Sequence, residues 1–220
     1  MGGSGRCAGE INNVNPHLSR APVAAGHSLV GARMACVLVH GRDQDDGVML
    51  DVAKRLNLGH VAYLFPLAAE RSWYPGRYFD PVTENEPHLS WAIEACGAAL
   101  ATARAAGVPD QRVVLGGFSQ GACVVAELLA REPRPIAGAA ILTGSLPGRP
   151  VDRTLPPLAG LRMLFALGRY DEWIALADAR ATGQAFERAG AEIVFETYED
   201  REHHINDQAV AGLRALLTAR

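Results

Sequence analysis

The sequence predicts an α/β fold in which a mostly parallel central sheet carries helices on both faces. Two observations indicate it. Short apolar runs alternate along the 220 residues with longer, alanine-rich stretches of helical spacing. No internal repeat, low-complexity tract or linker divides the chain, whose length suits one domain with a sizeable core better than two. We expect an irregular segment over residues 1–28 and the folded domain over residues 29–220.

Each expected strand is a short apolar run that ends near a turn residue. Residues 35–39 are apolar throughout and end at His40-Gly41, which is typical of a strand buried on both faces. Residues 61–65 form a second run, which Pro66 closes. Four further strands are expected over residues 112–115, 137–143, 163–167 and 193–198.

The expected helices follow these runs. Residues 47–58 carry Val48, Val52 and Leu56 at helical spacing. The next helix, over residues 88–106, has Pro87 at its start and Gly107 just past its end. Three further helices are expected over residues 120–131, 176–189 and 207–218.

Two segments are expected to be loops. Residues 144–160 are rich in proline. Residues 68–87 are longer and carry four aromatic side chains among three prolines. Loops of this length are usually functional or disordered, and the aromatic side chains favour an ordered one.

The composition excludes several classes of partner. Charged residues make up 20% of the chain, the formal net charge is −3, and no Lys/Arg cluster indicates a nucleic-acid or a membrane-surface site. No apolar run reaches the 18 residues typical of a membrane span, and the first 20 residues do not resemble a signal peptide. We therefore expect a cytoplasmic protein without stable membrane insertion.

The cysteines are also informative. Cys7, Cys36, Cys96 and Cys123 are widely spaced and form no CxxC pair, which argues against a structural zinc site. We expect free, buried thiols in a reducing compartment. Neither a metal nor another cofactor is expected.

The strongest motif is Gly117-Phe118-Ser119-Gln120-Gly121, which lies between an expected strand and an expected helix. That context is typical of the nucleophile elbow of α/β-hydrolases, in which a sharp turn exposes a serine hydroxyl at the edge of the sheet. The flanking glycines fit because larger side chains would collide with the adjacent strand and helix. We therefore predict that Ser119 is a nucleophile.

A serine nucleophile needs a base and an orienting carboxylate, which follow it in the order acid, then histidine, in α/β-hydrolases. Asp171 lies just after the expected strand 163–167, at the same sheet edge as the elbow, with Glu172 and Asp178 as rivals. His203 and His204 both follow the last expected strand, and at most one of them can face Ser119.

The residues around these two histidines offer one alternative to a catalytic site. A metal site formed by Glu202, His203 and His204 is disfavoured, because adjacent histidines rarely bind one ion. The remaining requirement is an oxyanion hole of two backbone amides. We predict these to be the amide of Gln120, directly after the nucleophile, and the amide of Arg42 in the loop after residues 35–39.

Together these residues resemble the carboxylesterase/phospholipase branch of the α/β-hydrolases, which includes acyl-protein thioesterases. The matching motifs are Val39-His40-Gly41-Arg42, Ser72-Trp73-Tyr74-Pro75, Asn85-Glu86-Pro87, Gly117-Phe118-Ser119-Gln120-Gly121-Ala122 and His203-His204-Ile205-Asn206-Asp207. The resemblance implies a small hydrolase without a separate cap domain, acting on carboxylic esters or thioesters.

The resemblance also assigns roles to single residues. In this branch an aliphatic residue stands two positions after the catalytic histidine, so Ile205 selects His203, and a Gly-x-x-Asp turn selects Asp171. Trp73 and Tyr74 are candidates either for walls of the acyl pocket or for packing anchors of their loop.

The sequence departs from the branch in two places. Asp43 stands where the branch usually has glycine, and Glu172-Trp173-Ile174 replaces a proline-containing turn after Asp171. Both departures lie near the expected site. They point to an unusual substrate or to altered chemistry.

Three functions fit these residues. The first is hydrolysis of a small-molecule ester or thioester through a Ser119–His203–Asp171 triad. The second is acyl transfer, lactonisation or cyclisation with the same triad, and the third is a non-catalytic ligand-binding module on a hydrolase fold. No nucleic-acid partner is expected, and the sequence leaves open whether the chain forms a homodimer.

Overall fold

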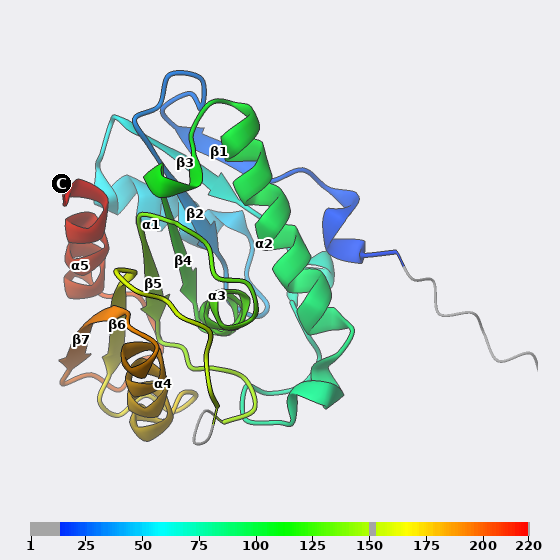
Figure 1. Ribbon diagram of the computed structural model, residues 1–220, viewed down its shortest axis with the longest axis vertical. Coiled ribbons are helices and arrows are strands. Elements are labelled where there is room, and N and C mark those ends of the chain that lie inside the picture. The colour runs from blue at the N-terminus through cyan, green and yellow to red at the C-terminus, as the bar shows by residue number, and fades with distance from the viewer. Residues whose placement is uncertain (1–13, 150–152, 220) are drawn as a thin grey trace, which may run out of the picture.

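The structure, a computed structural model, describes residues 14–149 and 153–219. Within these residues one sheet of seven strands lies at the centre, in the order β1-β3-β2-β4-β5-β6-β7 (Figure 1). β1 pairs antiparallel with β3, and every other neighbouring pair is parallel. The strands are β1 (Val23–Gly26), β2 (Met34–Val39), β3 (Val61–Phe65), β4 (Val113–Phe118), β5 (Gly138–Leu142), β6 (Arg162–Gly168) and β7 (Glu192–Tyr198).

Helices cover both faces of the sheet, as the sequence predicts (Figure 1). α2, α3 and α4 contribute to a core on one face, and α1 and α5 contribute to a second core on the other. The helices are α1 (Asp46–Leu56), α2 (His88–Ala105), α3 (Gln120–Arg131), α4 (Leu176–Arg188) and α5 (Asp207–Thr218). Within the described residues, no helix combines the length and the apolarity that a membrane span requires.

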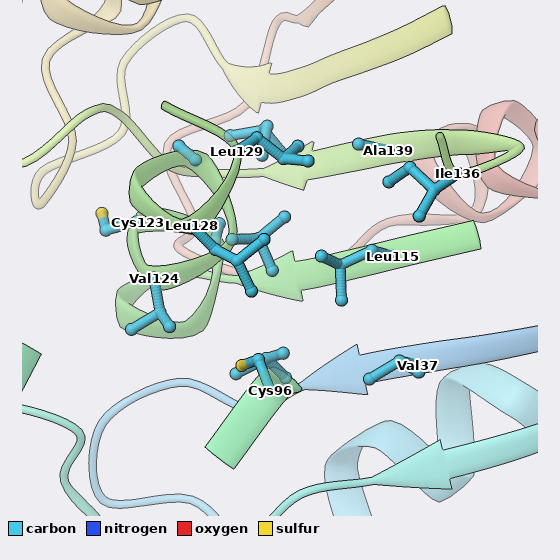
Figure 2. Close-up of a cluster of buried hydrophobic side chains, with 14 of the residues drawn as sticks. Val37, Cys96, Leu115, Cys123, Val124, Leu128, Leu129, Ile136 and Ala139 are labelled. Carbon is cyan, nitrogen blue, oxygen red and sulfur yellow. The ribbon is translucent and has the colours of Figure 1, made fainter. Parts of the chain in front are cut away.

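The larger core surrounds α3, whose first eleven residues are all buried. Figure 2 shows Val124, Leu128 and Leu129 of this helix in one cluster with Leu115 of β4 and Ala139 of β5. Burial of this kind contributes roughly 25 cal/mol per Å² of apolar surface. The helix that begins directly after Ser119 is therefore fixed by the interior of the protein.

One strand was not predicted. Residues 23–26 lie inside the segment 1–28 that the sequence predicts to be irregular, yet they form β1 and pair with residues 62–65 of β3. β1 is four residues long, mostly small, and only half-buried, so it carries no clear periodic signal. A 3₁₀ turn, η1 (Pro16–Ser19), precedes it. Residues 1–13 of the same segment lie outside the described residues.

The two loops predicted from the sequence are free of helices and strands longer than a 3₁₀ turn in the residues that the structure describes. The segment 68–87 contains the short turns η2 (Ala69–Arg71) and η3 (Val82–Asn85) and is ordered by buried side chains. Cys36, Cys96 and Cys123 are free and buried, as predicted, and Cys7 lies outside the described residues.

Candidate active site

Ser119 occupies the turn between β4 and α3 and has the backbone angles φ 54° and ψ −120°. A positive φ is unfavourable for a residue with a side chain, so the packing of the strand and the helix must impose it. A Cβ at Gly117 would overlap the carbonyl of Gly121, and a Cβ at Gly121 would overlap the carbonyl of Val39. The two motif glycines are therefore required by close backbone approach.

Ser119, His203 and Asp171 form one hydrogen-bonded series. The Nε2 atom of His203 lies 2.7 Å from the Ser119 Oγ, and its Nδ1 atom lies 2.8 Å from the Asp171 Oδ2. Because a carboxylate can only accept, Nδ1 carries the proton and Nε2 accepts the hydrogen bond of the serine hydroxyl. The series has the arrangement by which a histidine activates a serine.

Sheet topology explains how residues so distant in sequence meet. β6 and β7 are parallel neighbours, with Gly168 opposite Tyr198. The chain therefore leaves both strands at the same edge, and the loops that carry Asp171 and His203 start side by side. The Asp171 side chain is fully buried, and its Oδ1 accepts the amides of Trp173 and Ile174, each at 2.9 Å. These bonds fix the carboxylate that orients His203.

Of the rival residues, Glu172 borders the same pocket as Ser119, and the other two have partners of their own. The carboxylate of Asp178 accepts a hydrogen bond from the Tyr78 hydroxyl at 2.8 Å. His204 is half-exposed and faces Asp200 and Glu202, each at 3.3 Å. No group of three His, Cys, Asp or Glu side chains within residues 14–149 and 153–219 is arranged to hold a metal ion.

The two predicted oxyanion donors lie beside the nucleophile. β2 and β4 pair with Val39 opposite Gly117, so the chain leaves both strands at the same level. A Cβ at Gly41 would lie 3.2 Å from the Cβ of Ser119. Within the part of the chain that the structure describes, neither the Arg42 amide nor the Gln120 amide has an acceptor. Both remain able to donate to an oxygen held above Ser119.

Trp73 does not form a pocket wall, which corrects one of the two roles considered from the sequence. Its side chain is fully buried, and its indole Nε1 donates to the His40 carbonyl at 2.8 Å. Its backbone amide donates to the Gln120 Oε1 at 2.9 Å. Trp73 is an anchor that contacts Gln120 itself and His40, two residues before Arg42.

His40 is a site residue that the sequence analysis left without a role. Its Nε2 accepts the Ala68 amide at 3.1 Å, and its Nδ1 donates to the Gly41 carbonyl at 2.7 Å. Burial lowers the pKa of this imidazole below its usual value, so it is neutral near pH 7. The signal was present in the sequence, because His40 directly precedes the oxyanion loop.

The Arg42 side chain ties the oxyanion loop to the segment after Trp73. Its guanidinium donates to the carbonyls of Tyr74 at 3.0 Å and of Pro75 at 2.9 Å, and also to that of Gly76. The Gln120 Nε2 donates to the same Tyr74 carbonyl at 2.7 Å. The oxyanion loop, the elbow and residues 73–76 are thus one hydrogen-bonded unit.

A pocket of about 500 Å³ opens above Ser119 and His203. Apolar and aromatic side chains dominate its walls, namely Tyr74, Tyr78, Phe79, Cys123 and Ile174. Tyr74 therefore lines the pocket. A volume of this size is typical of sites for small molecules.

Both departures from the family pattern border this pocket. Asp43 has a φ of 59°, a conformation that glycine adopts most easily, which explains why glycine is usual at this position. Its amide donates to the Arg71 carbonyl at 2.8 Å. Trp173 is 66% exposed, and its ring centroid lies 6.2 Å from that of His203.

Comparisons with known proteins agree with this geometry. Residues 30–219 match the model of the phospholipase/carboxylesterase family. The chain is 22% identical over 200 residues to the mouse lysophospholipase-like protein 1, with 82% of each protein covered. It is similar to the crystal structure of a phospholipase/carboxylesterase from Dyadobacter fermentans, with a TM-score of 0.83, 26% identity, and 90% and 96% of the two chains covered. It also shares the fold of a Mesorhizobium loti carboxylesterase, with a TM-score of 0.70, 22% identity, and 87% and 92% covered.

Proposed function

The chain belongs to the phospholipase/carboxylesterase family and is an esterase-type hydrolase, and from this premise we propose that it cleaves carboxylic esters or thioesters through a Ser119–His203–Asp171 triad. The observation that carries the proposal is the hydrogen-bonded series, with 2.7 Å from Ser119 to His203 and 2.8 Å from His203 to Asp171.

The first half of the reaction forms an acyl-enzyme. The Ser119 Oγ attacks the substrate carbonyl carbon while His203 Nε2 accepts the hydroxyl proton. Asp171 stabilises the imidazolium, and the amides of Arg42 and Gln120 donate to the oxyanion. His203 then gives its proton to the departing alcohol or thiol, and the carbon–oxygen or carbon–sulfur bond breaks. In the second half, water attacks the acyl carbon and passes a proton to His203. His203 returns this proton to the Ser119 Oγ as the bond between Oγ and the acyl carbon breaks and the acid leaves.

The pocket places the two parts of the substrate. His203 must reach the leaving-group atom to give it a proton. The exposed ring of Trp173 lies beside His203, with 6.2 Å between the two ring centroids, so the leaving group departs next to this indole. The acyl group has the apolar walls of Tyr74, Tyr78 and Cys123 available to it. Arg77 and Glu172 also line the pocket, so charged groups border it as well as apolar ones.

The direct test is labelling with a fluorophosphonate, which reacts with an activated serine. We expect the intact mass to rise by one phosphonyl group on the wild-type protein, with the modified peptide containing Ser119, and no change on Ser119→Ala. Turnover of short-chain p-nitrophenyl esters should disappear in the same variant. A folded wild-type protein that is neither labelled nor active would refute the proposal and favour a non-catalytic binding module.

Acyl transfer is a second candidate, and the exposed Trp173 beside His203 favours it. An acyl acceptor has to bind where the leaving group departs, and an exposed indole offers it a surface. Turnover in the presence of rising concentrations of an aromatic alcohol or amine distinguishes the two reactions. A new ester or amide product supports transfer, whereas release of the free acid alone at every concentration supports hydrolysis.

A further inference from the structure

His17, in the short turn η1 before β1, contacts the segment that supports the oxyanion loop. Its Nε2 lies 3.1 Å from the Trp73 carbonyl, and its Nδ1 accepts the Ala69 amide at 2.9 Å. A carbonyl only accepts and an amide only donates, so Nε2 carries the proton and the imidazole is neutral. The side chain is 4% exposed. One buried imidazole therefore holds both ends of residues 69–73.

Trp73 passes this constraint to both predicted oxyanion donors. Its indole donates to the His40 carbonyl, two residues before Arg42, and its amide donates to the side chain of Gln120. The Trp73 ring also lies close to two imidazoles, with centroids 5.2 Å from His17 and 4.9 Å from His40. A shift of the Trp73 backbone would therefore move Arg42 and Gln120, whose amides are the predicted oxyanion donors.

The two histidines act on neighbouring amides. His40 accepts the amide of Ala68, and His17 accepts that of Ala69. This part of the chain is irregular and its amides have no strand to pair with, so the imidazoles supply the missing acceptors. Residues 68–73 are thus held from the oxyanion loop on one side and from the N-terminal segment on the other.

The N-terminal segment is itself anchored to the domain. The Asn15 Oδ1 accepts the His17 amide at 2.9 Å, and the Asn15 Nδ2 donates to the Trp91 carbonyl at 2.9 Å and to Glu94 at 2.8 Å. Both of these partners belong to α2. The family match begins only at residue 30, so the resemblance to the family gives these residues no role.

We propose that His17 is a positioning residue for the oxyanion hole: through Trp73 it fixes the placement of the Arg42 and Gln120 amides. The proposal rests on the function proposed above. An oxyanion hole acts on charge that develops only in the transition state, and misplacing its donors lowers the rate without weakening substrate binding. Deleting a whole donor costs about 10²–10³ in kcat, so loosening both should cost less.

The test uses the full-length chain with His17→Ala and His17→Gln. We expect His17→Ala to lower kcat on a p-nitrophenyl ester about tenfold and to leave KM within about twofold. Glutamine keeps one N–H donor and one oxygen acceptor, so His17→Gln should recover kcat to within about threefold of the wild type. Ser19→Ala is the matched control in the same turn and should leave both constants unchanged. Among residues 14–149 and 153–219, the Ser19 hydroxyl hydrogen-bonds only to the Pro16 carbonyl.

Two further measurements separate positioning from a general loss of stability. Leu213→Ala empties a fully buried site in the core on the opposite face of the sheet. Leu213→Ala should lower the melting temperature without the tenfold fall in kcat that is expected of His17→Ala. Hydrogen exchange should rise in residues 40–44 and 68–76 of His17→Ala and stay unchanged in residues 203–210. This readout remains valid even if the ester-cleaving function fails.

The outcome that overturns the proposal is equally defined. If His17→Ala keeps the wild-type kcat, or loses kcat only to the extent that Leu213→Ala does, His17 has no positioning role. Unchanged exchange at residues 40–44 would also refute it. Absence of activity in the wild-type protein itself would instead count against the proposed function, and the exchange data would then decide on His17 alone.

Discussion

The oxyanion side of the pocket and the acid–histidine side are built by different means. On the oxyanion side, buried side chains such as Trp73 and His40 join the loop after β2 to the elbow. On the other side, Asp171 and His203 lie on loops that follow β6 and the edge strand β7, and the adjacent Trp173 is 66% exposed. The side proposed to hold the developing charge is thus fixed by several buried hydrogen bonds, whereas the side proposed for the leaving group carries an exposed aromatic side chain. The replacement of a proline turn by Glu172-Trp173 lies on that second side.

The largest expected effect concerns the acid–histidine side. Asp171→Asn should lower kcat by about 10⁴, because an amide no longer fixes the required tautomer of His203 or stabilises its imidazolium. Asp178→Asn is the matched control, since asparagine can still accept the hydrogen bond of the Tyr78 hydroxyl. It should retain kcat within about threefold. Steady-state kinetics on one ester measures both, and the reverse ranking of the two variants would make Asp178 the acid.

A smaller effect is expected on the oxyanion side, where Trp73→Phe keeps one aromatic ring but removes the five-membered ring that carries the indole N–H. The His40 carbonyl then loses its 2.8 Å bond in a buried position. We expect unfolding free energy to fall by about 1–3 kcal/mol and kcat to fall about tenfold. Chemical denaturation and kinetics measure the two quantities. If stability falls and kcat does not change, the buried hydrogen bond of Trp73 does not hold the oxyanion donors in place.

The buried histidines give the oxyanion side a pH dependence of stability. Burial lowers the pKa of both His17 and His40, so below about pH 6.5 the unfolded chain takes up protons that the folded chain does not. Stability should therefore fall as the pH falls from 6.5, until the lowered folded pKa values are reached, and should be flat above about pH 7.5. Each histidine contributes at most about 1.4 kcal/mol per pH unit.

Neighbouring charges modify this dependence without reversing it. His40 and His88 repel a charged His17, while Asp45, Asp46 and Arg71 act on His40 with opposing signs. Urea denaturation between pH 5.5 and 8 measures how the unfolding free energy changes with pH. His17→Gln should reduce this pH dependence by the contribution of His17. An identical slope in wild type and His17→Gln would mean that His17 is protonated equally in both states.

The smallest effect is expected at Trp173. Trp173→Ala should lower kcat/KM about threefold for esters with an aryl leaving group and leave ethyl esters unchanged, because only a larger leaving group reaches the indole. Melting temperature should not change, since the side chain is largely exposed. Equal losses on both substrates would place Trp173 in the acyl pocket or in general support of His203.

Much of the fold was accessible from local patterns. The six parallel strands and five helices follow from apolar runs and helical spacing, because each is long or apolar enough to carry its own signal. β1 was missed because four small, half-buried residues have no periodic pattern, and pairing with β3 alone makes them a strand. Some element boundaries depend on tertiary packing. β4 continues to Phe118, with Gly116 packed closely against Leu38 and Gly117 against Gly121.

The sequence by itself determined the α/β architecture and the order of Ser119, Asp171 and His203, since the elbow motif and the residues after strand ends are local features. Only the tertiary structure decided which atoms meet. It brought His203 rather than His204 to Ser119, placed Trp73 beneath the oxyanion loop rather than in the pocket, and joined His17 to the site across more than fifty residues. The physical reason is that a buried polar group needs a partner, and the partner is chosen by proximity in space, which no short stretch of sequence records.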